Sequence, residues 1–331
     1  MIKLAIDLGS SMTKIYRADA GNGIVLAEPS CVAVDVNREI RAIGKEAKKL
    51  VGKTTELTEI VFPIYEGEII DERLAVEMLK KFLERVGGAS LWKRSETVFS
   101  IPCGMSEEGR ESYRTLAEEC GLKRVSFVEV PYLSAIGADA VLSEAEPVFT
   151  IDIGGGVTNI AVVSLYGIIA GLSMNIGGNN MDMNIMVKME REKGLRVGML
   201  TAERIKNEIG SLSLASRGSC VAEGSSVAYS RPAALSVQSA DVYDCIRVYV
   251  DKILEYATVV LNKLPAEVAA AVNKNGIYLS GGVAKIFGLP EYISKKLEMR
   301  TQVCEEPQFA VISGAGEVAR DKKLKMRISE E

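Results

Sequence analysis

The chain has 331 residues, of which 47% are hydrophobic and 25% are charged, and its net charge is −4. This composition excludes general disorder and general nucleic-acid binding, so no nucleic-acid partner is expected. The length favours two domains over one. The sequence contains no histidine, so triads, metal sites and acid–base steps that need an imidazole are excluded. Chemistry must come from carboxylates, lysines, hydroxyls and bound metal.

The cysteine pattern and the hydropathy predict a cytoplasmic protein. Six cysteines are scattered without a C-x-x-C pair, which is typical of reduced, mostly buried thiols. They are Cys31, Cys103, Cys120, Cys220, Cys245 and Cys304. The first residues do not resemble a signal peptide, and no run approaches the roughly 20 apolar residues of a membrane span. Any membrane contact is therefore expected to be peripheral.

A short pattern occurs twice, 145 residues apart, over residues 6–15 and 151–160. In each copy an apolar run predicts a buried strand, a glycine-rich stretch predicts a tight turn, and the following residues predict a returning strand. Each copy is thus a β-hairpin with an aspartate, Asp7 or Asp152, at its mouth.

The glycines of the two turns suit a phosphate site, because without side chains the backbone N–H groups can point at an anion. Two such hairpins facing each other would clamp one polyphosphate, with Asp7 and Asp152 placed to hold a hydrated Mg²⁺. One copy alone is weak evidence, since an aspartate and a glycine commonly end a hairpin. The duplication implies two similar halves with a ligand-binding cleft between them.

Strands and helices alternate after the first hairpin, which predicts an α/β first half. In chain order they are strands over 24–36, a short polar helix over 43–51, an amphipathic helix over 71–86, a strand over 96–102, a helix over 107–120, a strand over 125–130 and a helix from 131 to about 143. Gly87-Gly88 and Gly121 are expected to end two of these helices.

The second half begins with the repeated hairpin, and a tyrosine and a glycine at 166–167 predict a further strand–turn–strand. The next elements are helices over 181–193 and 201–211, a small β-appendage over 213–238, a long helix over 240–264, a strand over 276–279, an edge strand over 302–305 and a final helix over 310–319. Thr201 is predicted to cap the N-terminus of its helix. The tail from 321 alternates in charge and is expected to be a solvated end.

Two Asp-Gly hairpins and a later apolar-Ser-Gly-Gly turn form the fingerprint of the actin, sugar-kinase and heat-shock-chaperone ATPase superfamily, and the chain most resembles the MreB-like bacterial actins. The matching stretches are IVLAEPSCVAVDV (24–36), AIGKEAKKLVG (42–52), GEIID (67–71), PYLSAIG (131–137), DIGGGVTNIAVVSL (152–165), TAERIKNEIG (201–210) and GIYLSGGV (276–283). The resemblance implies an α/β, actin-like ATPase fold with a nucleotide cleft between two similar halves. These would be 1–145, with an inserted subdomain at about 32–68, and 146–331, with a small appendage at about 178–240.

The resemblance also implies a site for ATP or ADP with Mg²⁺. It assigns Asp7, Gly9, Ser10, Ser11 and Thr13 to the first phosphate loop, Asp152, Gly154, Gly155, Gly156 and Thr158 to the second, Glu203 and Lys206 to the ribose and base, and Gly281 and Gly282 to the adenine, with Val283 in place of the family's third glycine. Lys14 departs from the MreB pattern and resembles eukaryotic actin, where a lysine approaches the phosphates. The alternative for Lys14 is a surface lysine on a strand.

Two departures from the family pattern concern ATP hydrolysis. The family places a glutamate that orients the attacking water at the position of Val130, and a threonine that helps hold this water at the position of Val157. Neither valine can accept a hydrogen bond. Glu129 is a possible substitute, but a shift of one residue in an extended segment points it the other way. Slow ATP turnover is therefore expected, unless Glu129 or Lys14 has taken over the water.

The leading functional hypothesis is a self-assembling cytoskeletal filament protein that serves cell shape or intracellular organisation. A non-polymerising chaperone-like or reactivating ATPase is the alternative, and a small-molecule kinase lacks an evident aspartate base. Leu91 and the chain's single tryptophan, Trp92, are followed by two basic residues. They suit an anchor on an anionic membrane and correspond to an apolar pair that inserts into the bilayer in the MreB family. The alternative is a tryptophan folded back onto its own domain.

Overall fold

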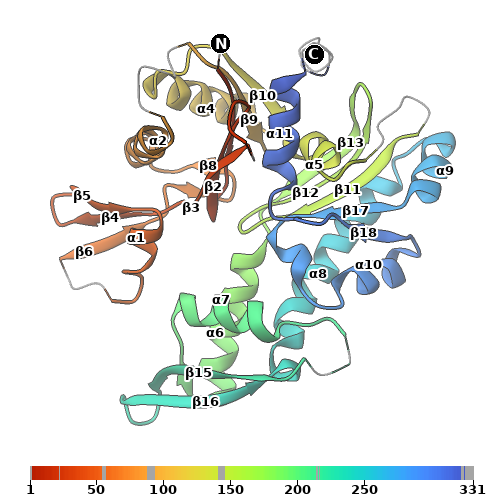
Figure 1. The fold of residues 1–331 in the computed structure, drawn as a ribbon. Coiled ribbons are helices and arrows are strands. Elements are labelled where there is room, and N and C mark those ends of the chain that lie inside the picture. The colour runs from red at the N-terminus through yellow and green to blue at the C-terminus, as the bar shows by residue number, and fades with distance from the viewer. Residues whose placement is uncertain are drawn as a thin grey trace.

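The computed structural model describes residues 2–21, 23–53, 57–87, 94–140, 146–213, 215, 217–321 and 324. Two five-stranded sheets dominate the architecture, one in each half of the chain, and smaller β-containing units extend from both (Figure 1).

The two large sheets have the same topology. In chain order the first contains β1 (Lys3–Leu8), β2 (Met12–Arg17), β3 (Ile24–Pro29), β9 (Glu96–Ile101) and β10 (Val125–Glu129), and the second contains β11 (Val148–Ile153), β12 (Thr158–Ser164), β13 (Gly167–Met174), β17 (Ile277–Ser280) and β18 (Thr301–Val303). β1 pairs antiparallel with β2 and parallel with β9, and β11 pairs antiparallel with β12 and parallel with β17. The repeated hairpins are therefore β1–β2 and β11–β12, and the sequence repeat is a structural repeat.

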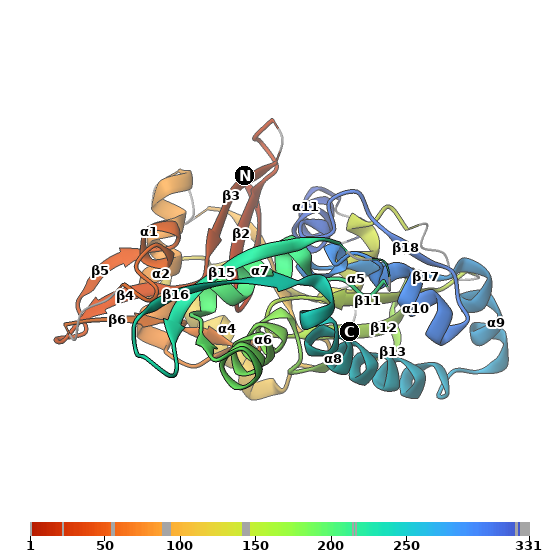
Figure 2. The same ribbon diagram turned by 90° about the horizontal axis from the view of Figure 1, so that it is seen from below.

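Each large sheet carries a smaller unit. The first holds β4 (Val32–Asp35), β5 (Ile40–Ile43), α1 (Lys45–Lys48), β6 (Thr58–Val61) and the hairpin of β7 (Ile64–Tyr65) and β8 (Glu68–Ile69); the second holds α6 (Gly178–Lys193), β14 (Leu195–Arg196), α7 (Met199–Ile209), β15 (Ser219–Ser226) and β16 (Pro232–Gln238). In the second unit α6 and α7 lie against the sheet of β14, β15 and β16 (Figure 2). The predicted β-appendage is confirmed as the β15–β16 hairpin.

Most of the remaining helices cover the outer faces of the two halves. They are α2 (Glu72–Val86), α4 (Glu107–Glu119), α8 (Ser239–Leu261), α9 (Ala266–Asn275), the short 3₁₀ helix η1 (Gly282–Lys285) and α10 (Leu289–Leu297). The amphipathic pattern of 71–86 is confirmed in α2, whose apolar side chains Leu74, Met78, Leu79, Phe82 and Leu83 are buried in the first core. Gly87 ends this helix as predicted.

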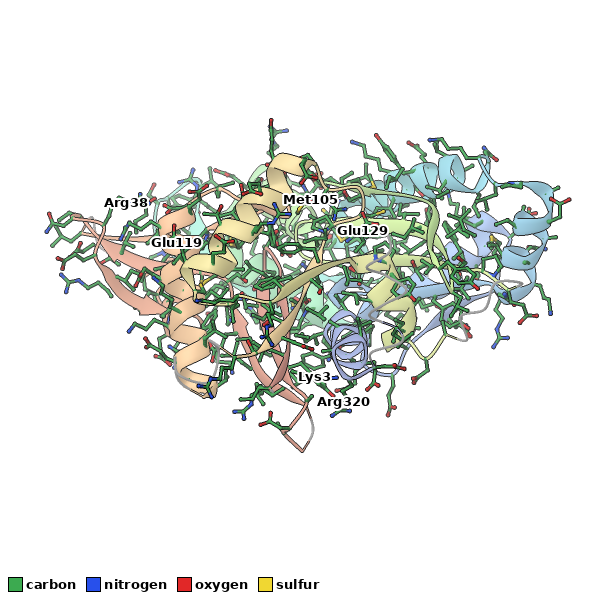
Figure 3. The ribbon with its side chains drawn as sticks, turned by 90° about the horizontal axis from the view of Figure 1, so that it is seen from above. Lys3, Arg38, Met105, Glu119, Glu129 and Arg320 are labelled. Atoms are coloured by element: carbon green, nitrogen blue, oxygen red, sulfur yellow. The ribbon has the colours of Figure 1, made fainter. Side chains whose placement is uncertain are left out.

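Two helices pack between the halves, α5 (Val130–Gly137) and α11 (Ala310–Arg320) (Figure 1). Their crossing requires glycine, because a Cβ on Gly137 would lie 1.8 Å from the carbonyl oxygen of Ala310, and a Cβ on Gly314 would lie 1.9 Å from that of Leu133. At the far end of α11, the Nζ of Lys3 in β1 donates to the carbonyl oxygen of Arg320 at 2.8 Å (Figure 3). The C-terminal helix thereby ties the second half of the sequence to the first sheet.

Several sequence predictions about helix ends were wrong, including the start of α6, three residues before the predicted Met181, and the end of α8, three residues before the predicted Leu264. α7 begins at Met199, two residues before Thr201, because Ala202 N already donates to the carbonyl oxygen of Gly198 at 3.0 Å. Thr201 is therefore inside the helix and does not cap it. α1 is shorter than the predicted 43–51, since β5 continues to Ile43.

The helix expected to reach residue 143 ends at Gly137. Asp139 has a left-handed backbone (φ 53°), and Ala140 N donates to the carbonyl oxygen of Ala135 at 3.0 Å. This arrangement closes a helix in the manner of a Schellman motif. The local geometry of Asp139 thus overrides the helix-favouring alanines around it.

Candidate functional site: a cleft between two repeated hairpins

A cavity of about 520 Å³ lies between the two repeated hairpins. Of the residues expected at the nucleotide, those that line it are Asp7, Gly9, Ser10, Ser11, Lys14, Asp152, Gly154, Gly155, Gly156, Glu203, Lys206, Gly281 and Gly282. Thr13 and Thr158 lie behind the loops, where the hydroxyl of Thr13 is 2.8 Å from that of Ser30 and the hydroxyl of Thr158 donates to the carbonyl oxygen of Ile176 at 2.7 Å. These two threonines therefore brace the turns from behind.

The turns of the two hairpins close in the same way. Gly9 N donates to the carbonyl oxygen of Met12 at 3.1 Å, and Gly154 N donates to that of Val157 at 2.9 Å. The turns also touch each other, because a Cβ added to Gly155 would lie 2.5 Å from the Cβ of Ser11. Glycine at 155 is thus required by the close approach of the loops, which brings backbone from both halves to one place.

The two aspartates face the cavity, and each is held by a serine. Asp7 accepts a hydrogen bond from the hydroxyl of Ser100 at 2.7 Å and pairs with the Nζ of Lys14 at 2.7 Å. Asp152 accepts a hydrogen bond from the hydroxyl of Ser280 at 2.6 Å. Both carboxylates are therefore oriented by the protein.

The Ser280 hydroxyl also lies 2.7 Å from that of Ser134 in α5. Because Ser280 gives its single proton to Asp152, Ser134 is the donor in this pair. Burial raises the pKa of Asp152 to about 6, and the negative charge of Asp7 adds to this, while Ser280 and the Lys14 ammonium act in the opposite direction. A cation between the two aspartates would stabilise the charged form of both.

The donor set fits Mg²⁺ bound through water and phosphate. No group of three or more acidic or cysteine side chains suited to a metal occurs in the described part of the chain. Mg²⁺ characteristically uses one or two carboxylates, keeps several waters and takes the remaining oxygens from substrate phosphates. Asp7 and Asp152 would supply the carboxylates, and the ion when bound would neutralise phosphate charge.

Two other lining residues, Glu203 and Lys206, already pair with other groups of the protein. Glu203 in α7 pairs with Lys48 of α1 at 2.7 Å, which joins the smaller unit of the first half to that of the second. The Nζ of Lys206 is buried, and it donates to Asp182 at 2.8 Å and to the carbonyl oxygen of Gly178 at 3.0 Å. Lys206 thus presents only part of its ammonium group to the cavity.

The glycine turn after β17 forms the wall beside them. Gly281 has a left-handed backbone (φ 86°), and a Cβ there would lie 2.2 Å from the carbonyl oxygen of Ile153. Its N–H donates to the carbonyl oxygen of Pro307 at 2.8 Å. The turn at Gly281 and Gly282 therefore leaves bare backbone at the cavity, as the sequence predicts for a base-binding wall.

The two valines at the expected water-positioning places both line the cavity. Val130 is the first residue of α5, and Val157 follows the glycines of the second turn. Among the residues that the structure describes, Glu129 is not one of those that line the cavity. Its carboxylate accepts hydrogen bonds from Gly104 N at 2.7 Å and from Arg110 at 3.4 Å, on the face that also carries Met105 (Figure 3).

Several residues of the site carried no signal in the sequence. Ser100 and Asp182 lie in segments without a motif, and Ser134 lies in the matching stretch 131–137 but was not assigned to the site; all three reach it only through packing between distant elements. The predicted membrane residues Leu91 and Trp92 lie outside the described residues. None of the described helices has the length and the apolar character needed to span a bilayer.

Comparisons with known structures define the class of protein. MreB5 of Spiroplasma citri bound to AMPPNP matches with a TM-score of 0.91 and 28% identity over 99% of this chain and 98% of that one. A MamK double helical filament matches with a TM-score of 0.80 and 20% identity over 97% and 99% of the two chains. The paired sheets and the cavity between them therefore belong to an actin-like fold.

Sequence comparisons identify the family to which the chain belongs. The MreB/Mbl protein family model matches residues 1–327. The cell shape-determining protein MreB of Escherichia coli is 33% identical over 323 residues, which cover 95% of this chain and 92% of the relative. The cell shape-determining protein Mbl of Bacillus subtilis is 31% identical over 330 residues, 98% of each chain. The chain belongs to the MreB/Mbl family.

Proposed function

We propose that this protein binds ATP with Mg²⁺ in the cleft and assembles into cytoskeletal filaments that serve cell shape or intracellular organisation. The observation that carries the proposal is the meeting of two equivalent Asp-Gly turns at one cavity, which is the arrangement needed to hold a polyphosphate from both sides. The names of the relatives, cell shape-determining proteins and a filament, support assembly. MreB5 bound to AMPPNP or to ADP supports a nucleotide ligand.

Assembly would follow from closure of the cleft. Head-to-tail contact of one surface with a different surface gives open filaments, and nucleotide would fix the angle between the halves 1–145 and 146–331 that such a contact needs. The ion pair of Lys48 with Glu203 already joins the two sides in the structure. ATP would add a further connection, through both turns.

Hydrolysis of ATP by this protein is proposed to be slow. Val130 and Val157 offer no hydrogen-bond acceptor on their side chains, and the carboxylate of Glu129 is held by Gly104 and Arg110. Loss of a polar group that orients or deprotonates a nucleophile costs about 10²- to 10⁴-fold in rate. Phosphate binding and Mg²⁺ binding use other residues, so ATP affinity would survive and filaments would be long-lived.

We also propose peripheral attachment to the inner face of the cytoplasmic membrane. The support is the sequence around Leu91 and Trp92, an apolar pair followed by two basic residues, which suits an anionic lipid surface. A single apolar loop binds weakly, so firm attachment would depend on the avidity of a polymer.

The experiment for nucleotide-dependent assembly compares the wild type with Asp152→Asn, which removes charge at nearly constant shape. Asp251→Asn is the matched control, because Asp251 pairs with Arg247 and Lys296 on α8 and α10, among residues that do not line the cavity. Sedimentation with ATP and Mg²⁺ should give polymer for the wild type and the control, and little for Asp152→Asn. Wild-type protein that stays monomeric with ATP, Mg²⁺ and lipid would favour a chaperone-like ATPase.

A further inference from the structure

The side-chain amide of Asn159 presents a hydrogen-bond donor to the nucleotide cavity. Asn159 lies in β12 and lines the cavity. Its Oδ1 accepts a hydrogen bond from the backbone N–H of Cys103 at 2.9 Å. Because a backbone N–H can only donate, this bond fixes which end of the amide is the oxygen. Nδ2 is at the opposite end, and no group in the described part of the chain accepts a hydrogen bond from it.

Nδ2 keeps accessible surface although Asn159 as a whole is buried, with 3% of the residue exposed. Among the residues that the structure describes, two fully buried side-chain atoms have no partner, Oδ1 of Asp182 and Oε1 of Gln308. The unbonded Nδ2 of Asn159 is not one of them, so it still reaches the space in the cavity that the residue lines. Most buried polar groups have a partner, and the acceptor for this one is therefore expected in the bound ligand.

The register of the second hairpin places Asn159 on the cavity face of its sheet. Asn159 lies directly opposite Asp152, and directly opposite residues of an antiparallel pair project to the same face. Asp152 lines the cavity. Val157, two positions before Asn159, lines it as well, in keeping with the two-residue period of a strand. Asn159 thus supplies a polar side chain on the face that carries a carboxylate expected to hold Mg²⁺.

The first hairpin has a lysine at the equivalent position. Lys14 lies directly opposite Asp7, as Asn159 lies opposite Asp152. Lys14 also lines the cavity, and its Nζ pairs with Asp7 at 2.7 Å. The structural repeat therefore places one nitrogen donor opposite each aspartate, a charged one in the first half and a neutral one in the second. The charged donor already has a partner in the protein, and the neutral donor has none among the described groups.

The chemistry of a nucleotide decides what this donor can meet. The ionised phosphate oxygens of a nucleotide only accept hydrogen bonds, and Nδ2 only donates them. We propose that Asn159 is a phosphate-binding residue whose Nδ2 donates a hydrogen bond to a phosphate oxygen of the bound nucleotide. A group that only donates cannot take a proton from water, so this role is compatible with slow hydrolysis. The inference rests on the proposed function, because it needs nucleotide in the cleft.

The test asks whether the affinity that Asn159 contributes depends on phosphate. Calorimetry on the full chain with Mg²⁺ compares ATP, ADP and adenosine as ligands of the wild type and of Asn159→Leu, which removes the amide at similar volume. Asn159→Asp keeps an acceptor for Cys103 N and replaces the donor by an anionic oxygen. It is titrated beside the wild type without Mg²⁺, because the ion would otherwise bridge the new carboxylate and the phosphates. Asn262→Leu and Asn262→Asp are the matched controls, since Asn262 is exposed at the end of α8 and does not line the cavity.

Asn159→Leu should bind ATP about 10-fold more weakly than the wild type, the effect of one hydrogen bond to a charged group, and should bind adenosine equally well. Asn159→Asp should lose more ATP affinity, because its anionic oxygen repels the phosphates, and both controls should match the wild type. ADP locates the contact: an unchanged ADP affinity assigns it to the terminal phosphate, and an equal loss assigns it to an inner one. Should Asn159→Leu fail to fold, Asn159→Asp, which retains the bond to Cys103, carries the test.

Two kinds of result would overturn the proposal, and they are distinguishable. A loss as large for adenosine as for ATP, or no loss for ATP in either variant, would show that Asn159 does not bind phosphate and would leave the nucleotide site standing. A wild-type protein that binds no ATP at all would instead remove the proposed function, and this inference with it.

Discussion

The crossing of α5 and α11 is the feature on which both halves of the molecule depend, and Gly314→Ala tests it with one methyl group. An alanine at 314 would place its Cβ 1.9 Å from the carbonyl oxygen of Leu133 and 2.9 Å from Gly137 N. Close carbon–oxygen contacts in proteins lie at about 3.3 Å, so the two helices would have to separate by roughly 1.4 Å. The atoms in the way are backbone, which cannot rotate aside.

The steric cost of Gly314→Ala is partly offset by the higher helix propensity of alanine. Alanine in a helix interior is favoured over glycine by about 1 kcal/mol, and forcing a methyl group into a packed region costs about 1–3 kcal/mol or more. Because the contact is between two backbones, we expect the upper end of that range and a net loss of about 2 kcal/mol. ATP affinity should fall as well, since Val130 at the start of α5 lines the cavity.

The matched control is Gly109→Ala in α4. There the new Cβ would meet the side chain of Met105, with Cγ at 2.9 Å, and this side chain can turn away. Chemical denaturation followed by circular dichroism should show lower stability for Gly314→Ala and equal or higher stability for Gly109→Ala. A Gly314→Ala protein as stable as the wild type would refute the close crossing.

Three further predictions concern the site and its surroundings. The double change Val130→Glu with Val157→Thr should release phosphate faster than the wild type under polymerising conditions, and a wild-type rate equal to or above that of the double variant would show that the water-positioning places are misassigned. Asp182→Asn should destabilise the fold by about 3 kcal/mol in urea denaturation, because it leaves the buried Lys206 ammonium without its anion; a loss below about 1 kcal/mol would contradict this. Trp92 fluorescence should shift with anionic liposomes when the protein is polymerised, and an unchanged spectrum would rule the anchor out.

The sequence predicted the parts of the fold that local patterns determine. The hairpins at Asp7 and Asp152 follow from an apolar run, a glycine turn and a second apolar run, and the structure confirms both strands of each. The end of α5 was missed because one left-handed residue, Asp139, closes the helix although the alanines beside it favour a helix. The start of α7 was missed because its N-cap residue, Gly198, provides no side-chain cap, so the sequence carries no capping signal there.

The sequence likewise predicted some residues of the site and missed others. It predicted the residues within the two turns, since each turn is continuous in the chain. Ser134 and Ser280, whose hydroxyls meet beside Asp152, are 146 positions apart, and only the packing of α5 against the second sheet brings them together.

Calorimetric titration of ATP into the protein with and without Mg²⁺ tests the central claim most directly, with Asp7→Ala, Asp152→Ala and the control Asp251→Asn measured beside the wild type. Both aspartates face the cavity from opposite hairpins, so each alanine variant should lose the Mg²⁺-dependent part of the affinity while the control keeps it. Unchanged ATP affinity with Mg²⁺ in both alanine variants would contradict a nucleotide clamped between the two hairpins.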